Sequence, residues 1–135
     1  MDDFCGTKEF LDSVMAIIIS VLGVGYDESV YREALKLELK KLDVKFECNV
    51  NVPITYKSVI FGDSQEIGKV EIDFVITRDR GAAIVVLHVV DKLSRRMFNQ
   101  VERYKQITGI EEAYIVHIPP GAQADMKKVV DVRKV

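Results

Sequence analysis

The segment at residues 82–90 constrains the fold of this chain more than any other. It reads Ala-Ala-Ile-Val-Val-Leu-His-Val-Val, with β-branched residues in its middle. A continuous apolar run of this kind is typical of a strand covered on both faces, although a buried helix has the same periodicity. The short length and the preceding Arg80-Gly81 favour the strand. We therefore predict a central strand, whose functional interpretation depends on Val86 and on His88, the residue that breaks the apolar pattern.

The length and composition indicate one globular domain, residues 1–135, which buries about two thirds of its unfolded surface. A net charge of -2 gives no general attraction to nucleic acid or to an anionic membrane. Cys5 and Cys48 are too few for a disulfide framework or a zinc site, and we expect no secretory leader. We expect an intracellular, reducing compartment. The apolar run at residues 14–24 is too short to span a bilayer, so we expect no membrane partner.

Two helices are predicted at the start of the chain. Residues 7–22 have apolar side chains at three-to-four spacing around most of the circumference, so this helix should be buried against the domain or against a partner. Gly23-Val24-Gly25 ends it. Asp27 then caps a second helix at residues 28–42, with its side-chain oxygen accepting hydrogen bonds from the first turn.

The period changes to two at Lys45, which predicts a half-buried strand that ends, or runs along an edge, at Pro53. A second strand is predicted at 54–61 and a third at 69–77. The third should form an antiparallel hairpin with the central strand, because the turn between them is tight.

A helix is predicted at residues 92–108 and a last strand at 113–118. A strand, a long helix and another strand imply a parallel right-handed crossover, so 113–118 should lie beside 82–90. The tail from Gly121 has a short apolar alternation and should add an edge strand or dock on a partner.

Several motifs in this order resemble those of one protein family. Gly25, Glu28 and Tyr31 have the spacing of the GxxExxY proteins, a branch of the PD-(D/E)XK nuclease superfamily. The resemblance continues in three further segments: Phe46 to Lys57, which looks like the family's strand pair, Ile72-Asp73-Phe74-Val75, and the Q-x-x-x-Y pattern of Gln100 and Tyr104.

The resemblance implies an α/β, restriction-endonuclease-like core. Its mixed sheet would contain a three-strand antiparallel meander, a crossover helix and a parallel strand, with two N-terminal helices. The core would span about residues 19–118, and residues 119–135 would form a C-terminal extension.

The same resemblance implies a divalent metal, Mg²⁺ or Mn²⁺, that activates water against a phosphodiester. The family takes one carboxylate from the helix, here Glu28, and one from the third strand, here Asp73. It takes a further Glu and a Lys from an E-x-K motif on the central strand. Gln100 and Tyr104 would support this site.

The chain departs from the family at the E-x-K motif, where Val86 replaces the Glu and His88 replaces the Lys. Valine cannot bind a metal, and histidine is shorter than lysine and mostly neutral at pH 7. Two replacements for the missing residues are disfavoured by geometry. Glu102 should point away around its helix, and in the displaced pair Asp91-Lys92 the carboxylate of Asp91 should lie on the face opposite His88. A third places His88 and His117 near Asp73, a donor set suited to Mn²⁺, Fe²⁺ or Zn²⁺.

A structural role for the same residues is the main alternative. Asp73 could keep its charge by pairing with Arg96, Arg103 or Lys69. Tyr31, Tyr104 and Gln100 could be core residues with satisfied polar tips.

Three functions follow from these alternatives. The preferred hypothesis is a nuclease-fold protein that is not an enzyme and needs no cofactor. It would act as a binding or assembly module, with a protein partner or a second copy meeting the apolar helix at 7–22. The second is a metal-dependent nuclease of DNA or RNA with a rearranged site at Glu28, Asp73 and His88. The third is a weak nucleic-acid-binding remnant, whose basic residues would be Lys92, Arg95, Arg96, Arg103 and Lys105.

Overall fold

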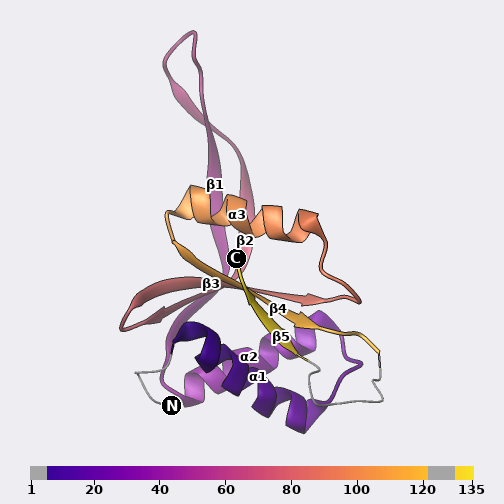
Figure 1. Cartoon of the computed structure of the whole chain (residues 1–135). Helices are drawn as coiled ribbons and strands as arrows, with labels where there is room; N and C mark the ends of the chain where they lie inside the picture. Colours follow the sequence, from indigo (N-terminus) through magenta and orange to yellow (C-terminus); the bar gives the residue numbers. More distant parts are fainter. Residues whose placement is uncertain (1–5, 122–129) are drawn as a thin grey trace.

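The computed structural model describes residues 6–121 and 130–135. It contains a five-stranded mixed sheet in the order β1-β2-β3-β4-β5, with helices on both faces (Figure 1). The elements in chain order are α1 (Thr7–Leu22), α2 (Glu28–Lys41), β1 (Lys45–Lys57), β2 (Ser64–Arg78), β3 (Gly81–Val89), α3 (Arg95–Thr108), β4 (Glu112–Ile118) and β5 (Asp131–Lys134).

The topology is the one expected for a restriction-endonuclease-like core. β1, β2 and β3 form an antiparallel meander, α3 crosses over, and β4 lies parallel to β3. The predicted parallel pairing of the two buried strands is therefore confirmed. β5 pairs antiparallel with β4 at the edge, as the tail's apolar alternation indicated; Val129 lies outside the described residues.

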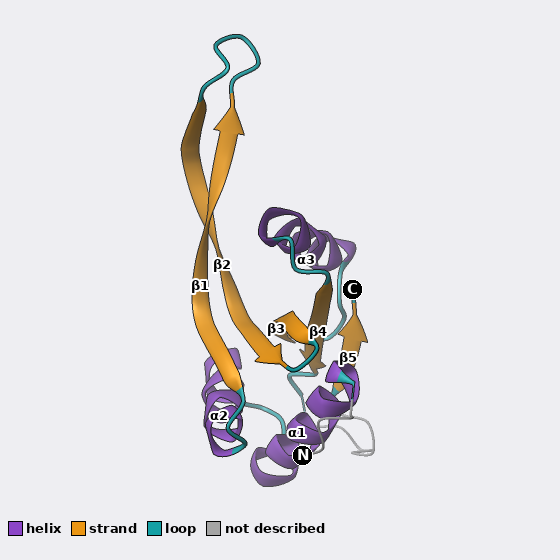
Figure 2. Ribbon diagram, turned by 90° about the vertical axis from the view of Figure 1, so that its left-hand side faces the viewer, coloured by secondary structure: helices purple, strands orange, loops and turns teal. Residues whose placement is uncertain are grey.

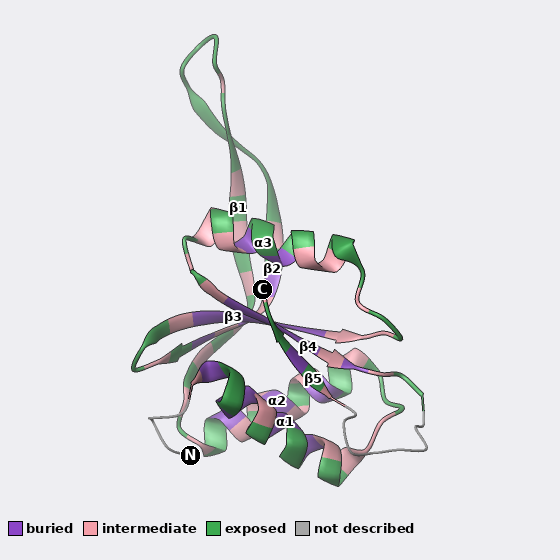
Figure 3. Ribbon diagram, in the orientation of Figure 1, coloured by how far each residue is buried: buried purple, intermediate pink, exposed green. Residues whose placement is uncertain are grey.

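The sheet separates two hydrophobic clusters, because the side chains of β3 alternate between its faces. Val85 and Leu87 pack with α1 and α2, whereas Ile84 and Val86 pack with α3. Figure 3 shows how the buried positions concentrate along the sheet and the inner helix faces. Full burial of such side chains stabilises the fold by about 1.5–3 kcal/mol each.

α1 has the predicted bounds, and its apolar stripe packs into the domain's own core. α2 lacks the side-chain cap that the sequence predicts. The Asp27 side chain makes no capping hydrogen bond, and its main-chain carbonyl instead accepts from Val30 N at 3.0 Å. α3 begins at Arg95, three residues later than predicted, because Ser94 caps it by accepting a hydrogen bond from Met97 N. Of the helices in the described residues, none has the length and apolar character needed to cross a membrane.

The prediction of separate strands on either side of Pro53 is wrong. β1 runs unbroken from Lys45 to Lys57, and β2 begins at Ser64, five residues before the predicted start at 69. Pro53 is tolerated because β1 is an edge strand, where a missing N–H need not break a ladder. Figure 2 shows the consequence: β1 and β2 rise together as a long twisted hairpin beyond the body of the domain.

Candidate functional site

The site begins where β2 leaves β3. Their ladder ends at the pair Phe74 and Val85, but β3 continues beside β4 as far as Val89. The N–H groups of Leu87 and Val89 point toward the departed strand, since N–H direction alternates along a strand. Leu87 N donates to Asp73 Oδ2 at 3.0 Å, and Val89 N donates to Glu28 Oε1 over a longer 3.4 Å. Two carboxylates thus replace the missing ladder partner.

A third side chain, Arg32, lies between these two carboxylates. Its Nη2 is 2.9 Å from Glu28 Oε2 and 3.2 Å from Asp73 Oδ1. Glu28 and Arg32 are four residues apart on α2, so they share a helix face. All four carboxylate oxygens therefore have a donor within the protein.

Val86 and His88, the two positions that the resemblance aligns with the family's E-x-K motif, lie on the α3 face of the sheet. Val86 is buried in the cluster beneath α3. His88 follows on the same face by alternation, and its Nε2 is buried without a hydrogen-bond partner in the described parts of the chain. It pairs in register with His117, so these two histidines are on adjacent strands as expected. His117 Nε2 already lies 2.7 Å from the carbonyl oxygen of Val90.

Tyr104 connects α3 to this region. It is almost fully buried, and its hydroxyl donates to the main-chain oxygen of Glu71 at 3.4 Å. Burial raises the pKa of Tyr104, and the negative charges of Asp73 and Glu71 raise it further, while a hydrogen bond with Gln100 acts in the opposite direction. The phenol therefore remains protonated near the carboxylate pair.

A groove of about 770 Å³ lies between α3 and β2. We call it the α3 groove; it is lined by Val70, Ser94, Arg96, Met97, Asn99, Gln100, Arg103 and Tyr104. Of the predicted nucleic-acid contacts, Arg96 and Arg103 line this groove, whereas Lys92 and Arg95 are exposed near the start of α3.

The suggested partners of Asp73 were wrong. Arg96, Arg103 and Lys69 form no ion pair with it, and among the described residues its cationic partner is Arg32. The spacing of Glu28 and Arg32 on one helix face was the signal that could have identified it.

The other residues that were considered as replacement metal ligands do not complete a metal site. Glu102 is exposed and lies 3.8 Å from Lys105 Nζ, and Asp91 is exposed beyond the end of β3. In residues 6–121 and 130–135, no group of three or more His, Cys, Asp or Glu side chains could hold a metal ion. Mg²⁺ prefers near-octahedral oxygen ligands. Two carboxylates bridged by Arg32 do not fit that requirement.

Comparison with known families decides the classification. A model of the PD-(D/E)XK nuclease superfamily matches residues 7–129. The chain belongs to this superfamily. Its assignment to the GxxExxY branch stays a prediction.

Among solved structures, that of SSO0001 is similar to this superfamily member, with a TM-score of 0.56 and 16% sequence identity. The similarity covers 79% of this chain and 48% of the SSO0001 chain, so this chain spans about half of that length. At this identity the likeness concerns the fold alone. No curated protein matches the chain.

Proposed function

We propose that this member of the PD-(D/E)XK superfamily has lost nuclease activity and acts as a binding or assembly module. The main support is the position of Arg32, whose guanidinium bridges Glu28 and Asp73. An active member would hold a divalent cation with these carboxylates. A guanidinium keeps its charge at all physiological pH values, so Arg32 permanently offsets one of the two negative charges.

The remaining oxygens of the two carboxylates support the same proposal. They accept hydrogen bonds from Leu87 N and Val89 N, which would otherwise be unpaired donors at the edge of β3. A buried unsatisfied N–H destabilises a protein by about 1–3 kcal/mol. Structural need alone is therefore enough to explain Glu28 and Asp73.

The central strand supports it further. Val86 has no donor atom, and it fills the cluster beneath α3 rather than facing a ligand. The chain's residues at this site can pair charges and cap a strand, but they supply neither a third carboxylate nor a lysine to orient water.

The test is a cleavage assay with purified protein. Single- and double-stranded DNA and RNA are incubated with Mg²⁺ or Mn²⁺, beside Asp73→Ala that is verified as folded by circular dichroism. We expect no cleavage above the Asp73→Ala background. Metal-dependent cleavage that disappears in Asp73→Ala would refute the proposal.

One observation favours a second candidate, a nuclease with a rearranged site at Glu28, Asp73 and His88, although these three described side chains are not grouped as a metal site in the structure. The buried Nε2 of His88 has no described partner, and an unpaired imidazole nitrogen is a typical ligand for Mn²⁺, Fe²⁺ or Zn²⁺. This candidate predicts stoichiometric metal binding that Asp73→Ala and His88→Ala each remove. Calorimetry without saturable binding would exclude it.

A third candidate, a non-catalytic nucleic-acid-binding remnant, has support from the exposed Arg96 and Arg103. It predicts weak affinity for DNA or RNA that falls steeply with salt. A flat response to salt would contradict it.

A further inference from the structure

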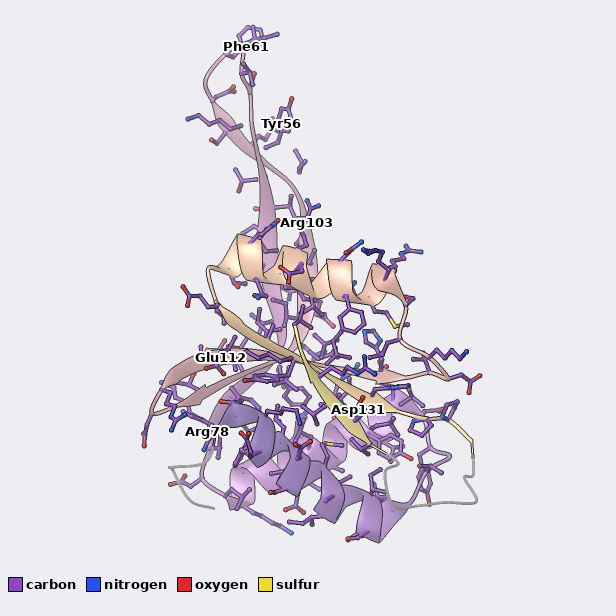
Figure 4. The ribbon with its side chains drawn as sticks, in the orientation of Figure 1. Tyr56, Phe61, Arg78, Arg103, Glu112 and Asp131 are labelled. Carbon is purple, nitrogen blue, oxygen red and sulfur yellow. The ribbon has the colours of Figure 1, made fainter. Side chains whose placement is uncertain are left out.

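The outer part of the β1–β2 hairpin, residues 53–69, has large apolar side chains that no described part of the chain covers. We call this part the arm, and its turn at residues 58–63 the arm tip. At the tip, Val59, Ile60 and Phe61 are 95%, 85% and 83% exposed, and Tyr56 and Ile67 lie exposed below them. Figure 4 shows Phe61 at the far end of the arm and Tyr56 between it and α3. Exposed apolar clusters of this kind usually mark an interaction surface.

The arm tip has a defined structure. Ser58 organises it: its N–H donates to the Asp63 carbonyl, its carbonyl accepts from Gly62 N, and its Oγ accepts from Phe61 N. The strands pair as far as Lys57 and Ser64. With the backbone held in this way, the apolar side chains stay displayed to a partner instead of folding inward.

The base of the arm has a complementary surface, the α3 groove. Val70, Met97 and Tyr104 give it an apolar lining, and the exposed Arg96 and Arg103 add positive charge. Neither arginine forms an ion pair with any described residue. The groove is thus suited to an apolar ligand with negative charges.

The arm has that chemistry. Asp63 lies in its tip and Glu66 follows near the start of β2, both exposed and close in sequence to the apolar Phe61 and Ile67. Neither acid is ion-paired within the described residues. Over the whole arm these two acids are offset by the exposed Lys57 and Lys69, so the negative charge beside the apolar cluster at the tip comes from Asp63. One chain therefore contains both an apolar tip with an acidic residue and a basic, apolar groove.

The dimensions allow two copies to exchange these surfaces. Val70 of the groove pairs in register with Val52, and Lys57, at the last rung before the tip, is five residues further along β1. At about 3.3 Å per residue, the groove and the tip are roughly 17 Å or more apart along the arm. Two arms lying antiparallel about a two-fold axis near mid-arm would each bring their tip to the other's groove. Such an isologous contact closes as a dimer.

We propose that the occupant of the α3 groove is the arm tip of a second copy of this chain. The inference rests on the assembly role proposed above and specifies its surface. α1 is less suited, because its apolar stripe is already buried in the core. Pairing of two β1 edges is also disfavoured, since Pro53 has no N–H to donate there.

The test measures the dimer dissociation constant of the full chain by sedimentation equilibrium up to about 100 µM, where weak dimers still associate. Wild-type protein should dimerise. Phe61→Ser should raise the dissociation constant about tenfold or more, as expected for a central apolar contact. Val21→Ser removes an equally accessible apolar side chain, 78% exposed on α1, and should leave the constant unchanged.

Charge reversal gives the sharper test. One variant combines Asp63→Lys with Glu66→Lys, and the other combines Arg96→Glu with Arg103→Glu. Each alone should be monomeric because the side chains at 63 and 66 then have the same charge as those at 96 and 103. An equimolar mixture should form a heterodimer because both contacts are again complementary.

Three results would overturn the proposal: a wild-type monomer at the highest concentration, a dimer insensitive to these changes, or a mixture that stays monomeric. Groove variants that lose binding to a short DNA duplex while keeping wild-type association would assign the groove to nucleic acid. None of these results depends on the cleavage assay, so the two proposals can fail separately.

Discussion

The two halves of β3 satisfy their backbone in different ways. From Ala82 to Val85 the strand has a backbone ladder with β2 on one side, and from Ala83 onward it has β4 on the other. From Val86 to Val89 only β4 remains, and the carboxylates of Asp73 and Glu28 accept the free N–H groups. A backbone ladder tolerates many side chains, whereas the second arrangement depends on particular charged residues. The fork between β2 and β3 is therefore the place where a structural and a catalytic role are hardest to separate.

The largest predicted effect is at Asp73. Asp73→Ala removes the acceptor of Leu87 N and one of the two carboxylates that pair with Arg32, so we expect a loss of about 2–4 kcal/mol in the free energy of unfolding. Urea denaturation followed by circular dichroism measures it.

The matched control is Thr77→Val, in the half of the strand pair that has a regular ladder, where Thr77 faces Ala82. Its exposed side chain should change stability by no more than about 0.5 kcal/mol. Equal or greater stability of Asp73→Ala would instead indicate two carboxylates held in mutual repulsion, as in an empty metal site.

A smaller loss is expected for Arg32→Ala. The substitution leaves Glu28 and Asp73 as neighbouring like charges, but Arg32 is partly exposed and solvent screens the pair, so we expect about 1–2 kcal/mol. Arg32→Lys keeps the charge and should recover part of the loss. Denaturation curves in low and high salt would measure both variants, and a stabilising effect of Arg32→Ala would contradict the account.

Glu28→Gln should have a weaker effect, about 1 kcal/mol or less. The glutamine retains an oxygen for Val89 N, whose bond is already long at 3.4 Å, and the lost ion pair with Arg32 is partly exposed. Hydrogen exchange at the Val89 amide should increase only modestly. A loss larger than that of Asp73→Ala would mean that Glu28, and not Asp73, is the principal strand cap.

The smallest effect on stability at neutral pH is expected at Tyr114. This residue is on β4 and pairs in register with Val85, in the half of β3 that has a regular ladder. Burial, together with the hydrogen bond that it donates to Glu112, raises the pKa of Tyr114 to about 12. Because the protonated phenol is favoured in the folded state, its stabilisation is complete below about pH 10 and is lost as the pH rises through about 12.

Tyr114→Phe should therefore flatten the fall in stability above about pH 10, with little change at pH 7. Unfolding curves collected across this range for both proteins measure the difference. Parallel pH profiles of the two proteins would show that Tyr114 makes no such contribution.

Much of the fold could be predicted because hydrophobic periodicity decides it. The apolar spacing of residues 7–22 gave α1 with its observed bounds, and the order of strand, helix and strand predicted the parallel pairing of β3 and β4. The arm could not be predicted in the same way. Both of its faces are exposed, so its strands have no buried apolar stripe to predict them. Pro53 also indicated the end of a strand, although β1 continues through it.

The composition of the site was predictable only in part. The motif spacing singled out Glu28 and Asp73, and the structure brings both carboxylates to Arg32, while their functional role stays a prediction. The correct cation was missed because ion pairing between α2 and β2 depends on how the helix is rotated over the sheet, which periodicity does not give. The hydrogen bonds from Leu87 N and Val89 N to the carboxylates depend on where β2 separates from β3. No residue pattern in the sequence predicts the position of that separation.

The most direct test of the account is calorimetric titration of Mn²⁺ into the wild-type protein, Asp73→Ala and Arg32→Ala. If Arg32 replaces a metal ion between Glu28 and Asp73, the wild-type protein shows no saturable binding, and only Arg32→Ala gains any affinity. Stoichiometric binding to the wild-type protein that Asp73→Ala removes would contradict the account and would identify the carboxylate pair as a working metal site.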